Sequence, residues 1–210
     1  MFTQYTSFKF FPRNRSGRDF VVGDIHGMFA ALDALLAQVD FSPTKDRVFA
    51  LGDLVDRGTE SVRALDYLCQ PWFYAIKGNH EFMLLDAALD HTAMNNWIKH
   101  NGGEWWLKTP DTLKIQLREQ IAYLPLAIEV QTAYGHFGLV HANMPFNLNW
   151  QTFIKNLNYD ADLQDYALWS RERLKRYQLG RYSANVIGID WLLVGHSPLD
   201  HPKCIANVYF

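Results

Sequence analysis

Short apolar runs, rich in β-branched and aromatic residues, recur along the chain and end abruptly in polar clusters. The runs and the clusters that follow them are DFVV then GDIHG, RVFAL then GDLVDRG, WFYAI then KGNHE, FGLV then HAN, and WLLV then GHS. The length and composition of each run predict a β-strand. Polar residues therefore stand at the end of every one of these predicted strands.

Segments with helical spacing separate or follow these runs. We predict helices over residues 28–39, 60–68, 81–90 and 110–124, a partly helical segment over 163–177, and a closing strand over 203–210. The alternation of strands and helices predicts βαβ units and largely parallel pairing. Because the carboxyl ends of parallel strands meet at one edge of a sheet, the polar clusters should gather there.

Composition narrows the class of protein. The chain has 210 residues, 49% of them hydrophobic and 20% charged, which suits a folded domain rather than a disordered chain. A formal charge of −2 argues against general nucleic-acid binding. Residues 1–17 lack a secretory signal, no 18-residue apolar stretch occurs, and only two cysteines are present. We therefore expect a cytoplasmic protein with no membrane partner and no disulfide framework.

The residues at the strand ends combine carboxylate, imidazole and amide groups. They are Asp24, His26, Asp53, Asp56, Arg57, Asn79, His80, Glu81, His141 and His196. Such a mixture suits divalent manganese, iron, zinc or cobalt, and the lack of thiolates argues against a structural zinc cluster. The set exceeds what one ion needs, so it favours two metals that share a bridging carboxylate.

Each motif alone has an ordinary structural interpretation. GDIHG could be a plain turn, GNHE could be a helix cap, and His141 and His196 could be hydrogen-bonded histidines at strand ends. Glycines precede the candidate ligands at Gly23, Gly52, Gly78 and Gly195. Glycine there permits sharp turns and close backbone approach. The recurrence of the whole ordered set favours a metal site over separate turns.

The motifs in combination resemble a known family. FVVGDIHG, LGDLVDRG, FYAIKGNHEFM, NWIKHNGGEWW, LVHANMP, LWSRERL and LVGHSPL together resemble the PPP-type metallophosphoesterases, and among them the small bacterial and phage serine/threonine protein phosphatases of the bacteriophage lambda type. The resemblance covers nearly the whole chain. It implies an α/β fold with a β-sheet core of two packed sheets, flanking helices and a βαβαβ metal-binding scaffold. It also implies a single domain over residues 1–210.

The resemblance implies two divalent metal ions, with manganese expected first and iron or zinc as alternatives. The implied ligands are Asp24, His26, Asp53, Asn79, His141 and His196. Asp24 and His26 would hold one metal, Asp53 would bridge, and the other three would complete the second site. His80 would be the proton donor and Asp56 the carboxylate that orients it. Arg57 and Arg171 would bind the phosphate.

The implied reaction is hydrolysis of phosphomonoesters, with phosphoserine or phosphothreonine in proteins or peptides as the expected substrate and phosphotyrosine or phosphohistidine as alternatives. Metal-bound hydroxide would attack phosphorus while His80 protonates the leaving group. Alternatives are a symmetrical diadenosine tetraphosphatase or another small-molecule phosphoesterase, a nuclease-type phosphodiesterase, and an inactive binding module. Asp56 and Glu81 disfavour the tetraphosphatase, the net charge disfavours the nuclease, and the intact ligand set disfavours the inactive module.

Two departures from the family pattern stand out. Asn143 follows His141 where the family has aspartate, so the environment of His141 should differ. The chain stops at Phe210, and we expect it to lack the family's last strand or strands and to leave an unpaired edge. Other residues are expected to be structural. They are surface histidines at 91, 100, 136 and 201, core or rim tryptophans at 105 and 106, and a solvated helix face over 171–176 apart from Arg171.

Overall fold

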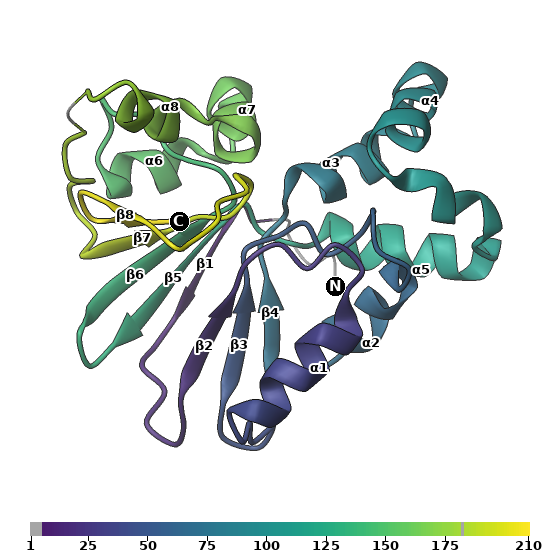
Figure 1. Ribbon diagram of the computed structural model, residues 1–210, viewed down its shortest axis with the longest axis horizontal. Coiled ribbons are helices and arrows are strands. Elements are labelled where there is room, and N and C mark those ends of the chain that lie inside the picture. The colour runs from purple at the N-terminus through teal and green to yellow at the C-terminus, as the bar shows by residue number, and fades with distance from the viewer. Residues whose placement is uncertain (1–5, 182) are drawn as a thin grey trace. The chain divides into compact units, whose positions relative to one another are not determined.

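The computed structural model describes residues 6–181 and 183–210. The chain divides into two compact units, which we treat separately. The first unit is residues 15–124, and the second is residues 1–14 with 125–210 (Figure 1). Residues 1–5, part of the segment expected to lack a secretory signal, lie outside the described residues. In the described part of the chain, no helix is long and apolar enough to cross a membrane.

The first unit contains a parallel sheet of order β2-β3-β4. Its strands are β2 (Asp19–Val22), β3 (Arg47–Ala50) and β4 (Phe73–Ala75), and their arrows point the same way in Figure 1. The helical segments are α1 (Phe29–Gln38), η1 (Ser61–Arg63), α2 (Ala64–Leu68), α3 (Asn79–Asp86), α4 (His91–His100), η2 (Gly103–Lys108) and α5 (Asp111–Ala122). The predicted strand–helix alternation and parallel pairing are confirmed here.

Apolar side chains from the helices fill the core of this unit. Phe29 of α1 and Leu117 of α5 are fully buried, and both belong to a cluster that includes Val48 and Phe73 of the sheet. Burying one such side chain stabilises the fold by about 1.5–3 kcal/mol. This packing holds the strands, and so the loops at their carboxyl ends, in place.

Asp46 fastens the start of β3 to the start of β2. Its buried carboxylate accepts hydrogen bonds from the backbone and side chain of Arg18, both at 2.7 Å, and from the Ser42 backbone at 3.0 Å. The Arg18 guanidinium holds the pKa of Asp46 well below its usual range, although burial opposes this shift. A depressed folded-state pKa means that the ionised carboxylate stabilises the fold at neutral pH and that this contribution is lost on acidification.

Asp46→Asn should lower the free energy of unfolding by about 1–3 kcal/mol at pH 7, because charge-assisted bonds are lost. The difference from wild type should shrink as the pH falls below about 3.9, where the unfolded carboxyl binds its proton. Urea denaturation at pH 7 and pH 3 measures both effects. Asp111→Asn is the control, since that carboxylate is 91% exposed and pairs only with Lys114 among the ion pairs of the described chain. A pH-independent loss in Asp46→Asn would contradict the prediction.

The second unit contains a mixed sheet of order β1-β5-β6-β7-β9-β8. Its strands are β1 (Phe8–Phe11), β5 (Ala127–Thr132), β6 (Gly135–Val140), β7 (Trp191–Leu193), β8 (Cys204–Ile205) and β9 (Val208–Tyr209). Its helices are α6 (Trp150–Asn156), α7 (Ala161–Trp169) and α8 (Glu172–Gln178). The β5–β6 and β8–β9 pairs are antiparallel, so the expectation of largely parallel pairing holds less well here than in the first unit.

The C-terminal segment is a hairpin, and the prediction of one closing strand over 203–210 is wrong. The chain reverses at Ala206, which has a left-handed φ of 57°, and Ile205 then pairs with Val208. The Asn207 side chain fixes the turn by accepting from the Val186 backbone at 2.7 Å. The last residues do not form the edge themselves, because β9 pairs with both β7 and β8; the edge at this side of the sheet is the two-residue β8.

Candidate active site

The GDLVDRG loop after β3 is tied to the start of α3 by one buried carboxylate. Glu81 accepts hydrogen bonds from the backbone of Asp53 and Leu54, both at 2.8 Å, and from the Gly78 backbone at 2.9 Å. Its side chain is fully buried. The alternative reading of GNHE as a helix cap captures only the local bond to Gly78. The two bonds to the loop after β3 join segments that are distant in sequence.

Several predicted site residues have left-handed backbones. The φ angles are 46° at His26, 50° at Asp53, 74° at Asp56, 67° at Arg57 and 63° at His196. Such a conformation costs a residue other than glycine about 1–3 kcal/mol and persists only where the surroundings enforce it. In the first unit, the hydrogen bond from the His26 backbone N–H to the Asp53 carbonyl at 2.7 Å helps to enforce this conformation. Strain of this kind gathers at functional sites.

The glycines before the candidate ligands differ in their importance. A Cβ at Gly78 would lie 2.3 Å from Oδ1 of Asp53, so only glycine allows this close approach. Gly52 has a left-handed φ of 90°. At Gly23 a Cβ would meet no atom within 4 Å, so its position does not require glycine for space. Three candidate ligands, His26, Asp53 and His196, have left-handed backbones themselves, which the pattern of preceding glycines did not predict.

One group of candidate metal ligands lies around His26. Its Nδ1 donates to the Val55 carbonyl at 3.1 Å, so Nε2 keeps its lone pair. That Nε2 lies 3.5 Å from Oδ2 of Asp53 and 4.0 Å from Oδ2 of Asp24. Burial lowers the pKa of His26, against the opposing charge of Asp53. A neutral imidazole beside two carboxylates is a donor set that fits a divalent cation.

His80 lies at the edge of the same cluster. Ligand atoms of His26, Asp53 and His80 lie within 4.8 Å of one another. Arg57 spans the two imidazoles, with Nη1 2.7 Å from Nε2 of His26 and Nη2 3.1 Å from Nε2 of His80. A planar guanidinium with several donors is the group best suited to bind phosphate oxygens. The cluster thus combines atoms that could bind a metal with a guanidinium that could bind phosphate.

The buried carboxylate of Asp56 binds His80 through the ring nitrogen Nδ1. Nδ1 of His80 donates to Oδ2 of Asp56 at 2.6 Å, as the family resemblance implied. Burial lowers the pKa of His80, but the hydrogen bond to Asp56 and the charges of Asp53 and Asp56 outweigh it and raise the pKa above its ordinary value. This pairing favours the protonated imidazole that a proton donor needs.

Asp56 has two further partners. The indole N–H of Trp97 donates to Oδ2 at 2.6 Å, and that of Trp105 donates to Oδ1 at 2.7 Å. Trp105 was expected only to fill the core or its rim, so this polar role was missed. The motif NWIKHNGGEWW holds both indoles, but nothing in its spacing says which side chain they reach.

The second unit brings together His141 and His196. They follow the parallel strands β6 and β7, and their ring centroids lie 5.1 Å apart. The Gly195 backbone donates to the His141 carbonyl at 2.8 Å, and Arg171 donates from Nη2 to the His196 carbonyl at 3.3 Å. The strand-end pattern therefore predicted correctly which residues of this unit meet.

Every residue predicted from the sequence to act in the site has a place in one of the two units. The first unit holds Asp24, His26, Asp53, Asp56, Arg57, Asn79 and His80, and the second holds His141, Arg171 and His196. Asn79 begins α3 and is buried. Contacts in the first unit run from Asp24 through His26 and Asp53 to His80.

Arg173 corrects the expectation that residues 171–176 form a solvated face. Its side chain is only 1% exposed, donates to the Ala184 carbonyl at 3.0 Å and lies over the Phe146 ring. Its Nε also donates to Oδ1 of Asn143 at 3.4 Å. Because arginine can only donate, the amide oxygen must face it, and the buried Nδ2 of Asn143 has no partner among the described residues. A neutral amide thus stands beside a buried cation at the position where the family resemblance led us to expect a carboxylate.

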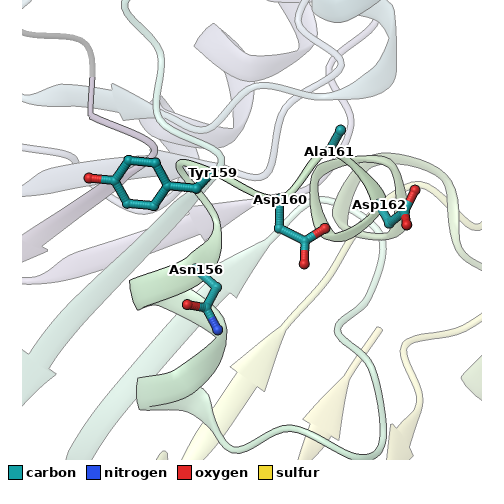
Figure 2. Close-up of a pocket in the computed structure, with 5 residues that line it drawn as sticks. All are labelled: Asn156, Tyr159, Asp160, Ala161 and Asp162. Atoms are coloured by element: carbon teal, nitrogen blue, oxygen red, sulfur yellow. The ribbon is translucent and has the colours of Figure 1, made fainter.

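A pocket of about 360 Å³ lies elsewhere in the second unit, between α6 and α7. Figure 2 shows its lining residues, which are Asn156, Tyr159, Asp160, Ala161 and Asp162. Asp160 accepts from the Leu163 backbone at 3.1 Å and so caps α7. None of these residues was predicted to act in the site, and the two acidic side chains occupy positions typical of a helix start.

Comparison with known proteins agrees with this chemistry. The model of the calcineurin-like phosphoesterase family matches residues 20–201. Serine/threonine-protein phosphatase 2 of Salmonella typhimurium is 35% identical over 196 residues, which cover 89% of this chain and 83% of that protein. A symmetrical bis(5'-nucleosyl)-tetraphosphatase of Shewanella loihica is 37% identical over 139 residues, which cover 65% of this chain and 48% of that protein.

Solved structures share the fold. A crystal structure described as a candidate diadenosine tetraphosphatase has a TM-score of 0.64 at 20% identity, covering 97% of this chain and 87% of that one. At this identity the likeness shows the fold alone. The α/β architecture predicted from the sequence is confirmed. From the family match and the extent of the sequence identity, the chain belongs to the calcineurin-like phosphoesterase family.

Proposed function

We propose that this phosphoesterase hydrolyses phosphomonoesters with two divalent metal ions, and that its substrates are phosphoserine and phosphothreonine in proteins. The observation that carries the proposal is the His80–Asp56 pair at 2.6 Å beside Arg57 and the donor atoms of His26 and Asp53. It unites a proton donor, a phosphate-binding fork and metal ligands. The long match to a protein named as a serine/threonine phosphatase supports the choice of substrate.

We propose as metal ligands the set named from the sequence, namely Asp24, His26, Asp53, Asn79, His141 and His196. Carboxylate, imidazole and amide donors suit manganese, with iron or zinc as alternatives. When bound, such ions acidify water so that hydroxide is available near neutral pH. We propose likewise that residues 1–210 act as one metallophosphoesterase domain.

The other side chains of the proposed site have separate roles in proton transfer and phosphate binding. His80 gives a proton from Nε2 to the leaving alkoxide, while Asp56 holds the opposite ring nitrogen. Arg57 and Arg171 bind the free oxygens of the phosphoryl group. A phosphomonoester dianion offers three free oxygens for these contacts. A diester offers only two and carries a single charge, so it suits this arrangement less well.

A symmetrical diadenosine tetraphosphatase is the second candidate function. The relative from Shewanella loihica favours it, although that match covers only 48% of the relative. Asp56 and Glu81 favour the protein phosphatase, because the tetraphosphatases that share these motifs tend to lack the first and to carry aspartate in place of the second. Both residues are buried and hydrogen-bonded in this chain.

A side-by-side assay tests the proposal. The protein is stripped of metal, reloaded separately with manganese, iron, zinc or magnesium, and given a phosphoserine peptide, diadenosine tetraphosphate and a bis-aryl phosphodiester. We expect activity to depend on metal and kcat/KM to be highest on the peptide. Arg171→Ala should lower it roughly ten- to a hundred-fold with metal retained, because a charge-assisted contact is worth about 1.5–3 kcal/mol.

Arg181→Ala is the control for Arg171, since Arg181 is exposed in the same unit. Faster turnover of the tetraphosphate or the diester than of the peptide would overturn the choice of substrate. Full activity after metal removal would overturn the metal-dependent reaction itself.

A further inference from the structure

Three tryptophans pack together behind the His80–Asp56 pair. Trp97 comes from α4, and Trp105 and Trp106 come from η2. Their rings meet edge to face, with centroids 5.4 to 6.2 Å apart. Two of the three point their indole N–H groups at the same carboxylate, that of Asp56. Packing alone does not require this, because a phenylalanine ring fills similar space without a donor.

The two indoles and His80 account for both oxygens of Asp56. Oδ1 accepts from Trp105 at 2.7 Å, while Oδ2 accepts from Trp97 and from His80, both at 2.6 Å. Asp56 is fully buried, and burying a carboxylate is costly unless donors surround it. An indole held by its neighbours is a rigid donor. The carboxylate therefore cannot rotate away from His80 without losing a bond at each oxygen.

The segment that carries the indoles also contacts Arg57. The Gly102 carbonyl accepts from the Arg57 backbone at 3.3 Å, and Gly102 has a left-handed φ of 85°. A Cβ at Gly103 would lie 2.7 Å from the Trp97 ring. The two glycines thus let one short segment approach both the arginine loop and the indole. This segment therefore supports both Arg57, which is proposed to bind phosphate, and Asp56, which holds the proposed proton donor His80.

We propose that Trp97 and Trp105 are positioning residues for the proton-transfer step. Their N–H groups lock Asp56 in the orientation that receives Nδ1–H of His80, and this leaves Nε2 of His80 directed toward Arg57. This proposal rests on the proposed function, in which His80 protonates the leaving group. It goes beyond that function because it assigns a role in the reaction to side chains that touch no substrate.

Phenylalanine substitutions test the proposal, because they keep an aromatic ring and remove only the donor. The kinetic parameters kcat and KM are measured for Trp97→Phe, Trp105→Phe and the double variant on a series from phosphoserine peptide to 4-nitrophenyl phosphate. We expect each single variant to lower kcat on the alkyl ester about three- to thirty-fold, less than the roughly 10²–10⁴-fold that a general acid itself contributes, because His80 remains in place. On the aryl ester, whose leaving group needs no proton, kcat should change less than about twofold. KM should stay unchanged.

Trp106→Phe is the matched control, because Trp106 is as buried as Trp97 and packs against both indoles, yet Asp56 accepts from the other two. It should affect alkyl and aryl esters equally. Equal losses on both esters in Trp97→Phe and Trp105→Phe, or no loss at all, would overturn the proposal. Trp105 is only partly buried, so Trp105→Phe keeps the test open if Trp97→Phe fails to fold.

A second readout separates this proposal from the proposed function. If the wild-type protein had no phosphomonoesterase activity, the proposed function would be refuted, but the role of Trp97 and Trp105 in positioning Asp56 would not. The proton NMR signal of Nδ1–H in His80 then decides: we expect a far-downfield, slowly exchanging signal that moves upfield or broadens in both indole variants and stays in Trp106→Phe. A signal that is unchanged in the indole variants would overturn the positioning role.

Discussion

His80→Asn is expected to lower kcat on phosphoserine peptides by about 10²–10⁴-fold, which is the usual contribution of a general acid. Alkoxides are poor leaving groups, so their departure depends on the proton that His80 supplies. The loss should be much smaller on aryl phosphates, whose phenolates leave without a proton. The measurement is kcat on both classes of substrate, together with elemental analysis of the metal bound per chain.

The metal content matters because His80 also lies within reach of the metal-binding cluster. Its ligand atom is within 4.8 Å of those of His26 and Asp53, so its position alone would also suit a ligand. The hydrogen bond from Nδ1 to Asp56, which raises the pKa of His80, favours the role of proton donor. Loss of a metal in His80→Asn, or equal losses on alkyl and aryl substrates, would remove His80 from that role.

Two further variants accompany this prediction. Asp56→Asn should reproduce the effect more weakly, because the imidazole stays but loses its carboxylate. His136→Asn should leave kcat unchanged. His136 is likewise held through Nδ1 by a carboxylate, that of Glu129 at 2.6 Å, but it lies on a strand of the second unit outside the predicted site. A loss of kcat in His80→Asn but not in His136→Asn would show that the effect belongs to His80 and not to every histidine that is bound to a carboxylate.

Local sequence patterns predicted the elements that carry the site and missed those that complete the sheets. Each of β2, β3, β4, β6 and β7 was anticipated, because a short apolar run followed by a polar cluster identifies a strand within a few residues of sequence. The pairing of β1 with β5 was not, because it joins Phe8 to Ala127 across more than half of the chain. The closing hairpin was missed because its turn depends on Ala206, a residue with no turn preference of its own.

In the candidate site, too, some features were predictable from the sequence and others were not. The strand-end rule and the family resemblance named the residues that cluster around His26 and Asp53, since their identity is visible in the sequence. Their left-handed backbones, the indole bonds to Asp56 and the burial of Arg173 were not predicted. Each depends on partners distant in the chain, and a single sequence does not show which distant donor a buried acceptor meets.

Glu81→Gln is expected to be the most destabilising single change in the first unit that leaves the size of the side chain intact. The carboxylate uses Oε2 for the Asp53 and Gly78 backbones and Oε1 for Leu54. In glutamine, an NH₂ group replaces one of these two oxygens. It would face the backbone N–H groups that the oxygen accepted from, so those hydrogen bonds are lost and buried donors face each other. At about 1.5–3 kcal/mol for each bond to a charged group, the free energy of unfolding should fall by about 3–6 kcal/mol. Urea denaturation measures this loss.

The same substitution should weaken metal binding, because Glu81 sets the backbone position of Asp53, whose Oδ2 faces His26. Isothermal titration of the folded variant with manganese measures that effect separately from stability. Glu81→Asp, which keeps the charge on a shorter side chain, should lose less stability than Glu81→Gln. Glu119→Gln on the exposed face of α5 is the matched control and should stay within about 0.5 kcal/mol of wild type. If Glu81→Gln unfolded like that control, the carboxylate would not be what joins the loop after β3 to α3.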